Sequence, residues 1–366
     1  MVLIIYILNI LLVCLFLYLS TRGNGSKNHK EPQKIWLVCC VSVLILTYAC
    51  RWRTGTDTPG YISGYGRMHY MSLKELFKLH DTAFYFILWI DNRIFSGNLV
   101  LHNIVLGIIT YIPIMYVYIK YSESYKMCII LYILTAAYYF GFNGQRQAVA
   151  VGICLIAYKA LLKRNIIVYS IIIIIASRFH STALFMLPVG FLVLLKTNKK
   201  PFIIITILLF LSALLAGSLW DKLFEILGMM GQDRLVDEYS NSGADYQGAN
   251  ILRFFVWAVP VILGIIAYKK SSKQFKDTDL IINLNIMGVV CMLAGNTNWL
   301  FARLAAYMMP ILPILLVRCS ILFESKSKLI YYMVIIALYA VYMWVYVHKD
   351  SSLIPYYFLN SNMKFY

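Results

Sequence analysis

Apolar runs separated by short polar stretches follow one another along nearly the whole chain. A helix needs about 20 consecutive apolar residues to cross a bilayer, and the runs are of this order. We expect membrane spans at residues 2–20, 35–50, 99–119, 127–143, 147–162, 165–177, 182–195, 201–219, 251–268, 280–298, 302–317 and 329–347. The pattern therefore predicts an all-α polytopic membrane protein with about 10–12 transmembrane helices.

Most lysines lie in polar stretches that the predicted spans place on the same side of the membrane. Lysine-rich polar stretches lie at residues 21–34, 120–126, 163–164, 196–200, 269–276 and 318–328. Positively charged loops stay on the cytoplasmic side, so we expect these stretches to face the cytoplasm. One further run, 83–96 (AFYFILWIDNRIFS), would reverse every later loop if it crossed the membrane. We predict instead an interfacial or re-entrant helix, which leaves about twelve spans and both termini outside.

Composition supports the membrane assignment and narrows the function. Of the 366 residues, 61% are hydrophobic and 13% are charged, whereas about a quarter of a soluble domain is charged. We expect one integral membrane domain over 1–366, with 220–248 as its largest outer hydrophilic loop. The net charge of +17 lies mostly in loops beside apolar runs, so we expect no nucleic-acid partner. The eight cysteines form no CxxC or His/Cys cluster, and nucleotide-binding and metal-binding motifs are absent, so we expect no cofactor and no metal.

Arginine and lysine separate between the two sides of this topology. The cytoplasmic side holds 16 lysines and 3 arginines, and the outer side holds 5 lysines and 9 arginines. The positive-inside rule gives the outer arginines no topological role, while the planar guanidinium suits bidentate recognition of phosphate. The outer arginines within a few residues of an apolar run are Arg51, Arg53, Arg146, Arg178, Arg253 and Arg303. They predict an anion site at headgroup depth; the alternative is that each contacts lipid phosphate or pairs with an acid of the 220–248 loop.

The stretch RWRTGTDTPGY, residues 51–61, adds a carboxylate to this group. Arg51, Arg53 and Asp57 follow directly on the second apolar run. The tetrapeptide TPGY, residues 58–61, has the residue pattern of a type II turn, with Pro second and Gly third. Asp57 is either a counter-ion for one of the two arginines or a general base that accepts a proton from, or orients, a sugar hydroxyl.

Three later motifs place polar side chains at the edges of apolar runs. FNGQRQAVAVG, SRFHSTAL and WLFARLAAY contain, in that order, the pairs Arg146 and Gln147, Arg178 and His180, and Arg303 and Tyr307. The glutamine amide needs hydrogen-bond partners at the start of a span, and the third pair is spaced to share one helix face. His180 is either a satisfied structural donor or, beside an arginine in a membrane cleft, a group with a chemical role.

In this order the motifs resemble those of the EpsG-like, Wzy-type bacterial polysaccharide polymerases. The likeness runs from about residue 50 to about residue 310 and rests on R-x-G-x-D-x-x-x-Y, then R-Q-x-x-A, then F-H-S-x-A. The resemblance implies a GT-C-type bundle of membrane helices with outer loops. It also implies a glycosyltransferase of the bacterial cytoplasmic (inner) membrane, with its active site facing the periplasm or exterior. Such an enzyme transfers a glycan from undecaprenyl diphosphate to the distal sugar hydroxyl of another lipid-linked repeat unit.

The resemblance and the charge pattern together define the residues of the expected site. We expect catalysis to involve Asp57, Arg146, Arg178 and His180. We expect the diphosphate or the sugar to be bound by Arg51, Arg53, Gln147, Arg253, Arg303 and Tyr307. The implied partners are an undecaprenyl-diphosphate-linked oligosaccharide, membrane lipids, and a chain-length regulator and a flippase of the same pathway.

Three other classes of function fit parts of the pattern. An O-antigen ligase would use the same donor with a different acceptor. A transporter or flippase would carry charges at mid-span and inverted repeats, whereas this chain has its charges at the edges of runs and no internal repeat. A multi-span acyltransferase would open its basic site to the cytoplasm, opposite to the predicted location of the arginines.

Overall fold

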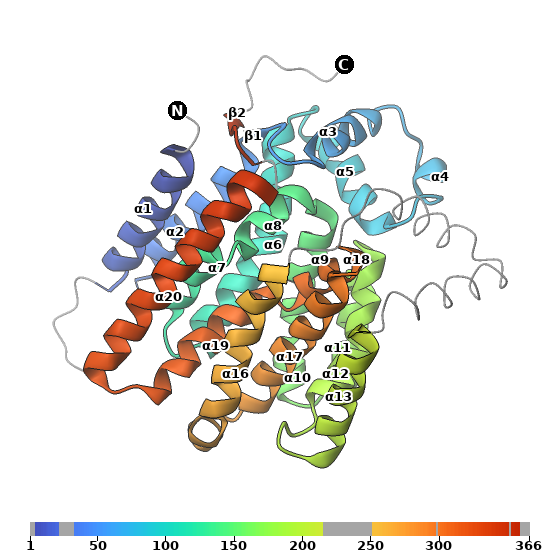
Figure 1. Ribbon diagram of the computed structural model, residues 1–366. Helices are drawn as coiled ribbons and strands as arrows, with labels where there is room; N and C mark the ends of the chain where they lie inside the picture. Colours follow the sequence, from blue (N-terminus) through green and yellow to red (C-terminus); the bar gives the residue numbers. More distant parts are fainter. Residues whose placement is uncertain (1–3, 22–32, 215–250, 298, 351–352, 359–366) are drawn as a thin grey trace. The chain divides into compact units, whose positions relative to one another are not determined.

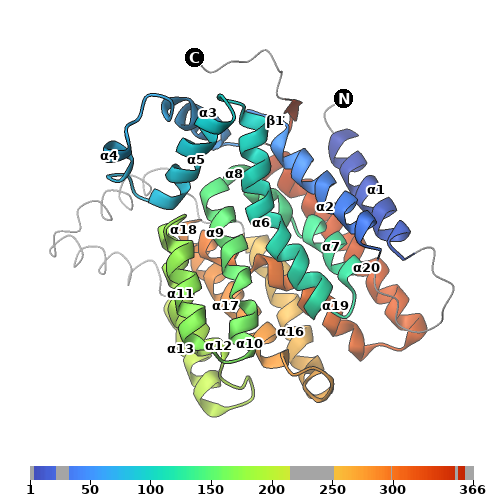
Figure 2. The ribbon, with the colours of Figure 1, turned by 180° about the vertical axis from the view of Figure 1, so that it is seen from behind.

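The described residues, 4–21, 33–214, 251–297, 299–350 and 353–358 of a computed structural model, are almost all helical. They divide into two compact units, seen from opposite sides in Figures 1 and 2. The first unit comprises Met1–Ala160, Ile167–Leu184 and Ser325–Tyr366, and the second comprises Leu161–Ile166 and Phe185–Glu324. The single membrane domain over 1–366 stays a prediction, and the 220–248 loop lies outside the described residues.

The first unit combines the N-terminal part of the chain with its C-terminal helix. The helices wholly or mostly within it are α1 (Ile4–Leu19), α2 (Lys34–Ala49), α3 (Thr58–Arg67), α4 (Leu73–Leu76), α5 (Thr82–Ile94), α6 (Leu99–Tyr121), α7 (Tyr125–Leu134), α8 (Ala137–Asn143), α9 (Gln145–Ile156), α10 (Tyr158–Leu162), α11 (Ile166–Ser177), the 3₁₀ segment η1 (Ser181–Phe185), α20 (Ser325–Val345) and the π-helical η5 (Tyr346–Asp350). Strands β1 (Arg51–Trp52) and β2 (Tyr357–Phe358) pair antiparallel, with Arg51 opposite Phe358.

Helix α6 forms the centre of the first unit, where it packs against α2, α5, α7 and α9 (Figure 2). Gly152 of α9 lies so close to α6 that an added Cβ would clash with the carbonyl oxygen of Ile109. Small residues allow this kind of backbone approach between membrane helices. Tyrosines fill the core nearby: the buried ring of Tyr111 lies 5.5 Å from that of Tyr48 and 5.2 Å from that of Tyr138. This packing fixes α9, whose first turn contributes to the site described below.

The second unit is organised around α17. Its elements are α12 (Met186–Val193), α13 (Lys200–Leu214), α16 (Ile251–Gln274), α17 (Thr278–Gly295), α18 (Trp299–Leu304), the 3₁₀ segments η2 (Ala305–Tyr307) and η3 (Met309–Ile311), α19 (Leu312–Cys319) and η4 (Ser320–Leu322). Helix α17 is buried along nearly its whole length and packs against α12, α13, α16, α18 and α19. Close to its start, Asp277 accepts a 2.7 Å hydrogen bond from the buried guanidinium of Arg318.

Helix length and composition identify the chain as a multi-pass membrane protein. Among the described residues, four helices are long and apolar enough to cross a bilayer: Leu99–Tyr121, Arg253–Gln274, Thr278–Gly295 and Ser325–Lys349. Two helix pairs bent by 47° and 49° would raise the number to six, namely Tyr125–Leu134 with Ala137–Asn143 and Trp299–Tyr307 with Met309–Leu322. The shorter apolar helices are Ile4–Leu19, Lys34–Ala49, Ile166–Ser177, Ser181–Val193 and Lys200–Leu214. The all-α polytopic fold predicted from the apolar runs is confirmed.

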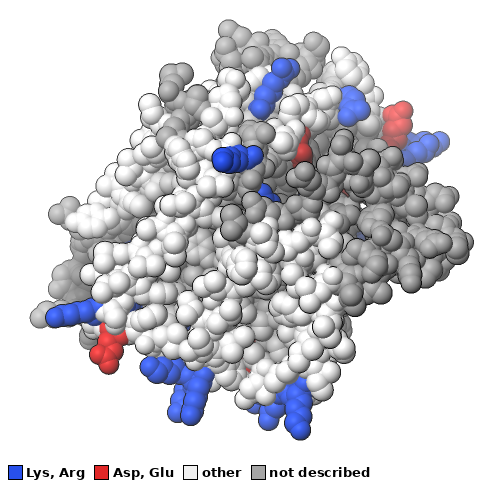
Figure 3. Space-filling model, viewed as in Figure 1, with Lys and Arg blue, Asp and Glu red and all other residues white. Residues whose placement is uncertain are grey.

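The surface of α20 is typical of a helix that faces lipid. No Lys, Arg, Asp or Glu lies between Leu329 and Val345, and the apolar side chain of Leu338 is exposed. Lys326 and Lys328 stand at the start of the helix. Figure 3 shows the surface over the middle of α20 uncharged, with charged side chains near both of its ends.

The run 83–96 coincides with helix α5 rather than with a long span. The helix has 13 residues, which at the usual rise per residue makes it about 20 Å long. A bilayer core is roughly 30 Å thick, so α5 is too short to cross it. One face of α5 is buried through Phe84, Leu88, Asp91 and Asn92.

One local prediction is wrong. Residues 58–61 form the first turn of α3 and not a type II turn. Proline fits the first turn of a helix because the N–H that it lacks would have no partner there. Arg303 lies in α18 and Tyr307 in the 3₁₀ segment η2 that continues it, and the shared face of this pair stays a prediction.

Candidate functional site

Asp81 joins segments of the first unit that are far apart in the sequence. Its Oδ2 accepts a hydrogen bond from Nη1 of Arg146 at 2.9 Å and lies 3.5 Å from Nδ1 of His180. Its Oδ1 accepts a 3.0 Å hydrogen bond from the backbone N–H of Ser181. The side chain of Asp81 is 6% exposed and that of Arg146 is 34% exposed. The carboxylate is therefore buried and positions its partners, whereas part of the guanidinium remains accessible to a ligand.

Three helix ends bring these groups together. Asp81 immediately precedes α5 and has a left-handed backbone, with φ +54°, which aspartate tolerates better than most residues. Arg146 lies in the first turn of α9, and His180 follows the end of α11. The N–H of Ala83 donates to the carbonyl of Arg178 at 3.0 Å, so the start of α5 is tied to the end of α11. We call Asp81, Arg146, Arg178 and His180 the Asp81 cluster.

The surroundings of Asp81 favour its ionised form. Burial opposes the charged carboxylate, but the His180 imidazole, the Arg146 guanidinium and the Ser181 N–H outweigh burial and lower the pKa of Asp81 below its usual value. An ionised carboxylate favours a proton on the imidazole nitrogen that faces it, here Nδ1 of His180. Nε2 of a neutral His180 is then the proton-accepting nitrogen.

Arg178 borders two hollows beside Asp81. The first, of about 360 Å³, includes Asp81, Ser177 and Ser181 in its lining. The second, of about 490 Å³, is lined by the aromatic rings of Phe77 and Phe86 together with Thr82, Ala83 and Arg178. Arg178 thus borders one hollow that contains a carboxylate and two serine hydroxyls and another that contains two aromatic rings. Such a cation suits an anionic group that joins a polar part of a ligand to an apolar part.

The sequence matches a model of the EpsG family over residues 34–358, which covers most of the chain and the whole Asp81 cluster. The chain belongs to the EpsG family. This is the family of Wzy-like polysaccharide polymerases, so the resemblance drawn from the ordered motifs is confirmed and a role of the polysaccharide-polymerase type follows. No curated protein and no solved structure matches the chain. The GT-C-type arrangement of its helices stays a prediction.

In this EpsG-family protein the 51–61 stretch packs against the junction of α8 and α9. Gly55 has φ +100°, and a Cβ added there would clash with Oδ1 of Asn143. The same Oδ1 accepts a 2.9 Å hydrogen bond from the N–H of Thr56, and Oγ1 of Thr58 donates to a carbonyl of α8 at 3.2 Å. Asn143 lies three positions before Arg146 in the sequence. The first motif therefore holds the turn from which Arg146 projects.

The charged residues of the same stretch lie in contrasting environments. Arg51 is fully buried; its guanidinium donates to the carbonyl of Tyr48 and lies 3.9 Å from the ring of Tyr48 and 5.0 Å from that of Phe142. Arg53 is exposed, and Asp57 is half-buried just before α3. Arg51 thus has a packing role through cation–π contacts. The ligand-binding roles of Arg51 and Arg53, and the choice of role for Asp57, stay predictions.

The remaining predicted residues are divided between the two units. Gln147 is buried in α9. Arg253, Arg303 and Tyr307 belong to the second unit, where Cζ of Arg303 lies 4.2 Å from the ring of Trp299 and Tyr307 is buried. Their participation in the same site as the Asp81 cluster stays a prediction.

Asp81 and a second buried pair, Asp91 with His102, were not among the predicted site residues. Oδ2 of Asp91 in α5 and Nδ1 of His102 in α6 lie 2.8 Å apart, and the ring of Tyr65 stacks on the imidazole at 4.5 Å. Asp81 carried a usable signal, because an aspartate directly before an apolar helical run indicates a helix start. Asp91 lies inside the apolar run 83–96, where an acid indicates a buried partner.

Proposed function

We propose that the Asp81 cluster transfers a glycan from a lipid diphosphate to a sugar hydroxyl. The acceptor hydroxyl attacks the anomeric carbon of the donor glycan, the bond between that carbon and the diphosphate breaks, and the diphosphate leaves as an anion. The observation that carries the proposal is a single carboxylate that contacts both Arg146 and His180 beside a hollow bordered by Arg178.

In this proposal His180 accepts the proton of the attacking hydroxyl. Asp81 faces Nδ1 of the ring, which orients Nε2 as the acceptor and stabilises the imidazolium that forms. Asp57 is the weaker candidate for the base, because it stands at the start of α3 and accepts a 3.1 Å hydrogen bond from Oγ1 of its neighbour Thr56. In the Asp81–His180 pair, His180 is the proton acceptor and Asp81 is the residue that orients it.

The two arginines stabilise the charge that develops on the leaving diphosphate. Arg178 borders both hollows and Arg146 has an open side, so both can donate hydrogen bonds to phosphate oxygens. Fixed donors aimed at a developing charge typically contribute about 10²–10³ to the rate each. We propose that this stabilisation operates without a metal ion.

The hollows suit the two parts of such a donor. The sugars would occupy the hollow that contains Asp81 and Ser181, and the prenyl chain would lie against Phe77 and Phe86. The proposed donor is a glycan on undecaprenyl diphosphate, and the proposed site faces the outside of the bacterial inner membrane, opposite to the lysine-rich loops. A chain-length regulator and a flippase of the same pathway are the proposed protein partners.

Reconstitution tests this function. Purified protein in liposomes, given one lipid-linked repeat unit in the presence of EDTA, is expected to produce a ladder of longer chains. His180→Ala is expected to abolish the ladder. If a verified native unit gives no ladder, the polymerase proposal is wrong. Transfer of preformed chains to a different lipid acceptor, without a ladder, would identify a ligase instead.

A further inference from the structure

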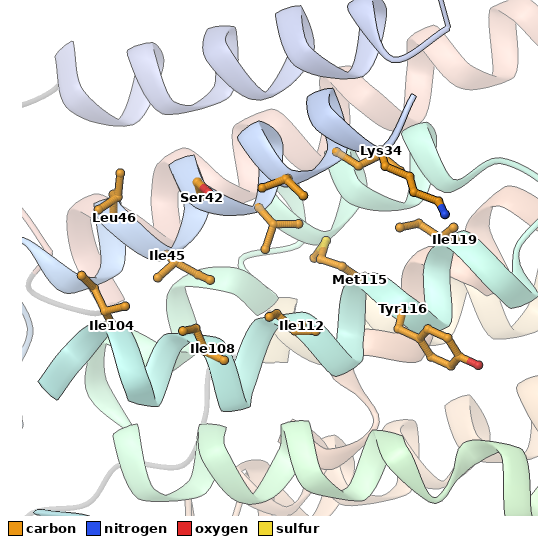
Figure 4. A pocket seen from close by; sticks show the side chains of 13 residues that line it. Lys34, Ser42, Ile45, Leu46, Ile104, Ile108, Ile112, Met115, Tyr116 and Ile119 are labelled. Carbon is orange, nitrogen blue, oxygen red and sulfur yellow. The ribbon is translucent and has the colours of Figure 1, made fainter. Parts of the chain in front are cut away.

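An apolar groove of about 620 Å³ runs between α2 and α6 in the first unit (Figure 4). Its floor includes the buried side chains of Ile45 and Met115, and its rims include exposed Val38 and Ile108. The helices lie close together at Gly107, where an added Cβ would lie 3.1 Å from Cγ2 of Ile45. The groove is thus built by two packed helices and is open along its length on one side.

One end of the groove is cationic. Figure 4 shows Lys34 and Tyr116 at the same end, away from Leu46 and Ile104. Lys120, in the last turn of α6, is not part of the lining, but its Nζ lies 5.8 Å from the ring centroid of Tyr116, which is. Two ammonium groups and a phenol therefore lie in or beside one end of a groove whose other lining residues, apart from Ser42, are apolar.

The groove has the length of a lipid tail. From Lys34 to Leu46 the helix α2 rises by twelve residues, or about 18 Å. One leaflet of a bilayer core is about 15 Å thick, half of the whole. A chain that starts at Lys34 and follows the groove therefore crosses its own leaflet.

We propose that this groove binds one acyl chain of an anionic phospholipid of the cytoplasmic leaflet. The headgroup phosphate would lie at Lys34 and Lys120, on the side that the lysine-rich loops assign to the cytoplasm. A prenyl donor with its diphosphate at the outer site would enter at the Leu46 and Ile104 end, and the described lining has no cation there. The position of the two lysines at the cytoplasmic end therefore favours the phospholipid over the prenyl donor. This proposal does not depend on the polymerase function.

Native mass spectrometry of the full chain in detergent tests the proposal. Phosphatidylglycerol is expected to stay bound at concentrations at which phosphatidylcholine with the same acyl chains dissociates. Lys34→Gln and Lys120→Gln are each expected to weaken phosphatidylglycerol binding about fivefold, the usual effect of one lysine near an anionic headgroup. Ile112→Trp puts a bulky ring on an exposed position of the groove lining and is expected to abolish retention.

Matched variants on α20 separate this site from general lipid contact. Lys328 is exposed with its Nζ 6.0 Å from the ring of Tyr332, much as Lys120 stands by Tyr116, and Leu338 is an exposed apolar residue. Lys328→Gln and Leu338→Trp are expected to leave binding unchanged. Equal retention of phosphatidylcholine, full retention by Ile112→Trp, or displacement of phosphatidylglycerol by undecaprenyl phosphate at a lower concentration would each overturn the proposal. Lys34→Arg keeps the positive charge at this end of the groove and is expected to keep the affinity.

Discussion

Asp81 accepts a hydrogen bond from Arg146 at 2.9 Å, although the two residues are 65 positions apart in the sequence. The same carboxylate oxygen lies 3.5 Å from Nδ1 of His180. One acid therefore positions both a cation and an imidazole. Because Asp81 stands at the start of α5, the placement of this short helix controls the geometry of the whole cluster.

Asp81→Asn is expected to lower the polymerisation rate about 10²-fold or more, the range typical of a disabled general base. The amide keeps the size of the side chain but loses the negative charge that pairs with Arg146 and favours the required tautomer of His180. Initial rates of ladder formation in the reconstituted system measure the effect. Asp57→Asn is the matched comparison and should retain most of the activity. A large loss in Asp57→Asn with little change in Asp81→Asn would reverse the two roles.

The interactions of the Asp81 carboxylate with Arg146 and His180 should weaken only at acid pH. Its pKa is lower in the folded protein than in the unfolded chain, where an aspartate titrates at about 3.9. The resulting stabilisation is fully present above that value and is lost as the pH falls through the lowered folded-state pKa. We expect the difference in thermal stability between wild type and Asp81→Asn to persist from about pH 8 to 5 and to shrink below about pH 4. A difference that already shrinks between pH 7 and 5 would contradict this assignment.

Arg146→Lys and Arg178→Lys should each slow polymerisation by about 10²-fold, because lysine keeps the charge and loses the planar pair of donors. Arg93→Lys is the control. Arg93 lies on α5 with its Cζ 3.7 Å from the ring of Trp89, and its guanidinium donates to backbone carbonyls. Its replacement should change the rate little. Wild-type rates in both test variants would show that these arginines do not stabilise the leaving diphosphate.

Two glycines of the first motif should respond in opposite ways to alanine. Gly55→Ala combines a φ of +100° with a clash against Asn143 and should cost about 1–2 kcal/mol or more. Gly60 lies in the first turn of α3, where an added Cβ meets nothing within 4 Å, so Gly60→Ala should be neutral or stabilising by up to about 1 kcal/mol. Thermal unfolding in detergent compares them. Equal destabilisation would mean that the packing of Gly55 on Asn143 is unimportant.

The apolar pattern predicted the helices because the bilayer requires each spanning segment to satisfy its own backbone hydrogen bonds. It also predicted that Arg146, Arg178 and His180 stand at helix ends, since polar groups are costly inside an apolar run. Their meeting around Asp81 is a tertiary contact, and no spacing in one sequence encodes it. The pairing of Asp91 with His102 is also a tertiary contact and could not be predicted for the same reason.

Local ambiguity explains the other differences. The TPGY tetrapeptide fits both a type II turn and the first turn of a helix, and the carbonyl that accepts a hydrogen bond from Thr58 comes from distant α8. Arg51 and Arg53 are two positions apart, yet one is fully buried and the other exposed. Burial of Arg51 depends on the rings of Tyr48 and Phe142, and only the folded chain places them around it.

The orientation of the chain can be tested with single cysteines at exposed positions. Gly60→Cys should react with a membrane-impermeant maleimide added outside intact cells or spheroplasts, because Gly60 is exposed at the predicted outer side. Lys328→Cys should react only after permeabilisation. The neighbouring Thr58 is only 3% exposed, so a cysteine there would be a poor target for the reagent. The native cysteines are buried or half-buried, and labelling of the unmodified chain measures their background reaction. Reaction at position 328 with protection at position 60 would place the Asp81 cluster on the cytoplasmic side and exclude an outward-facing polymerase.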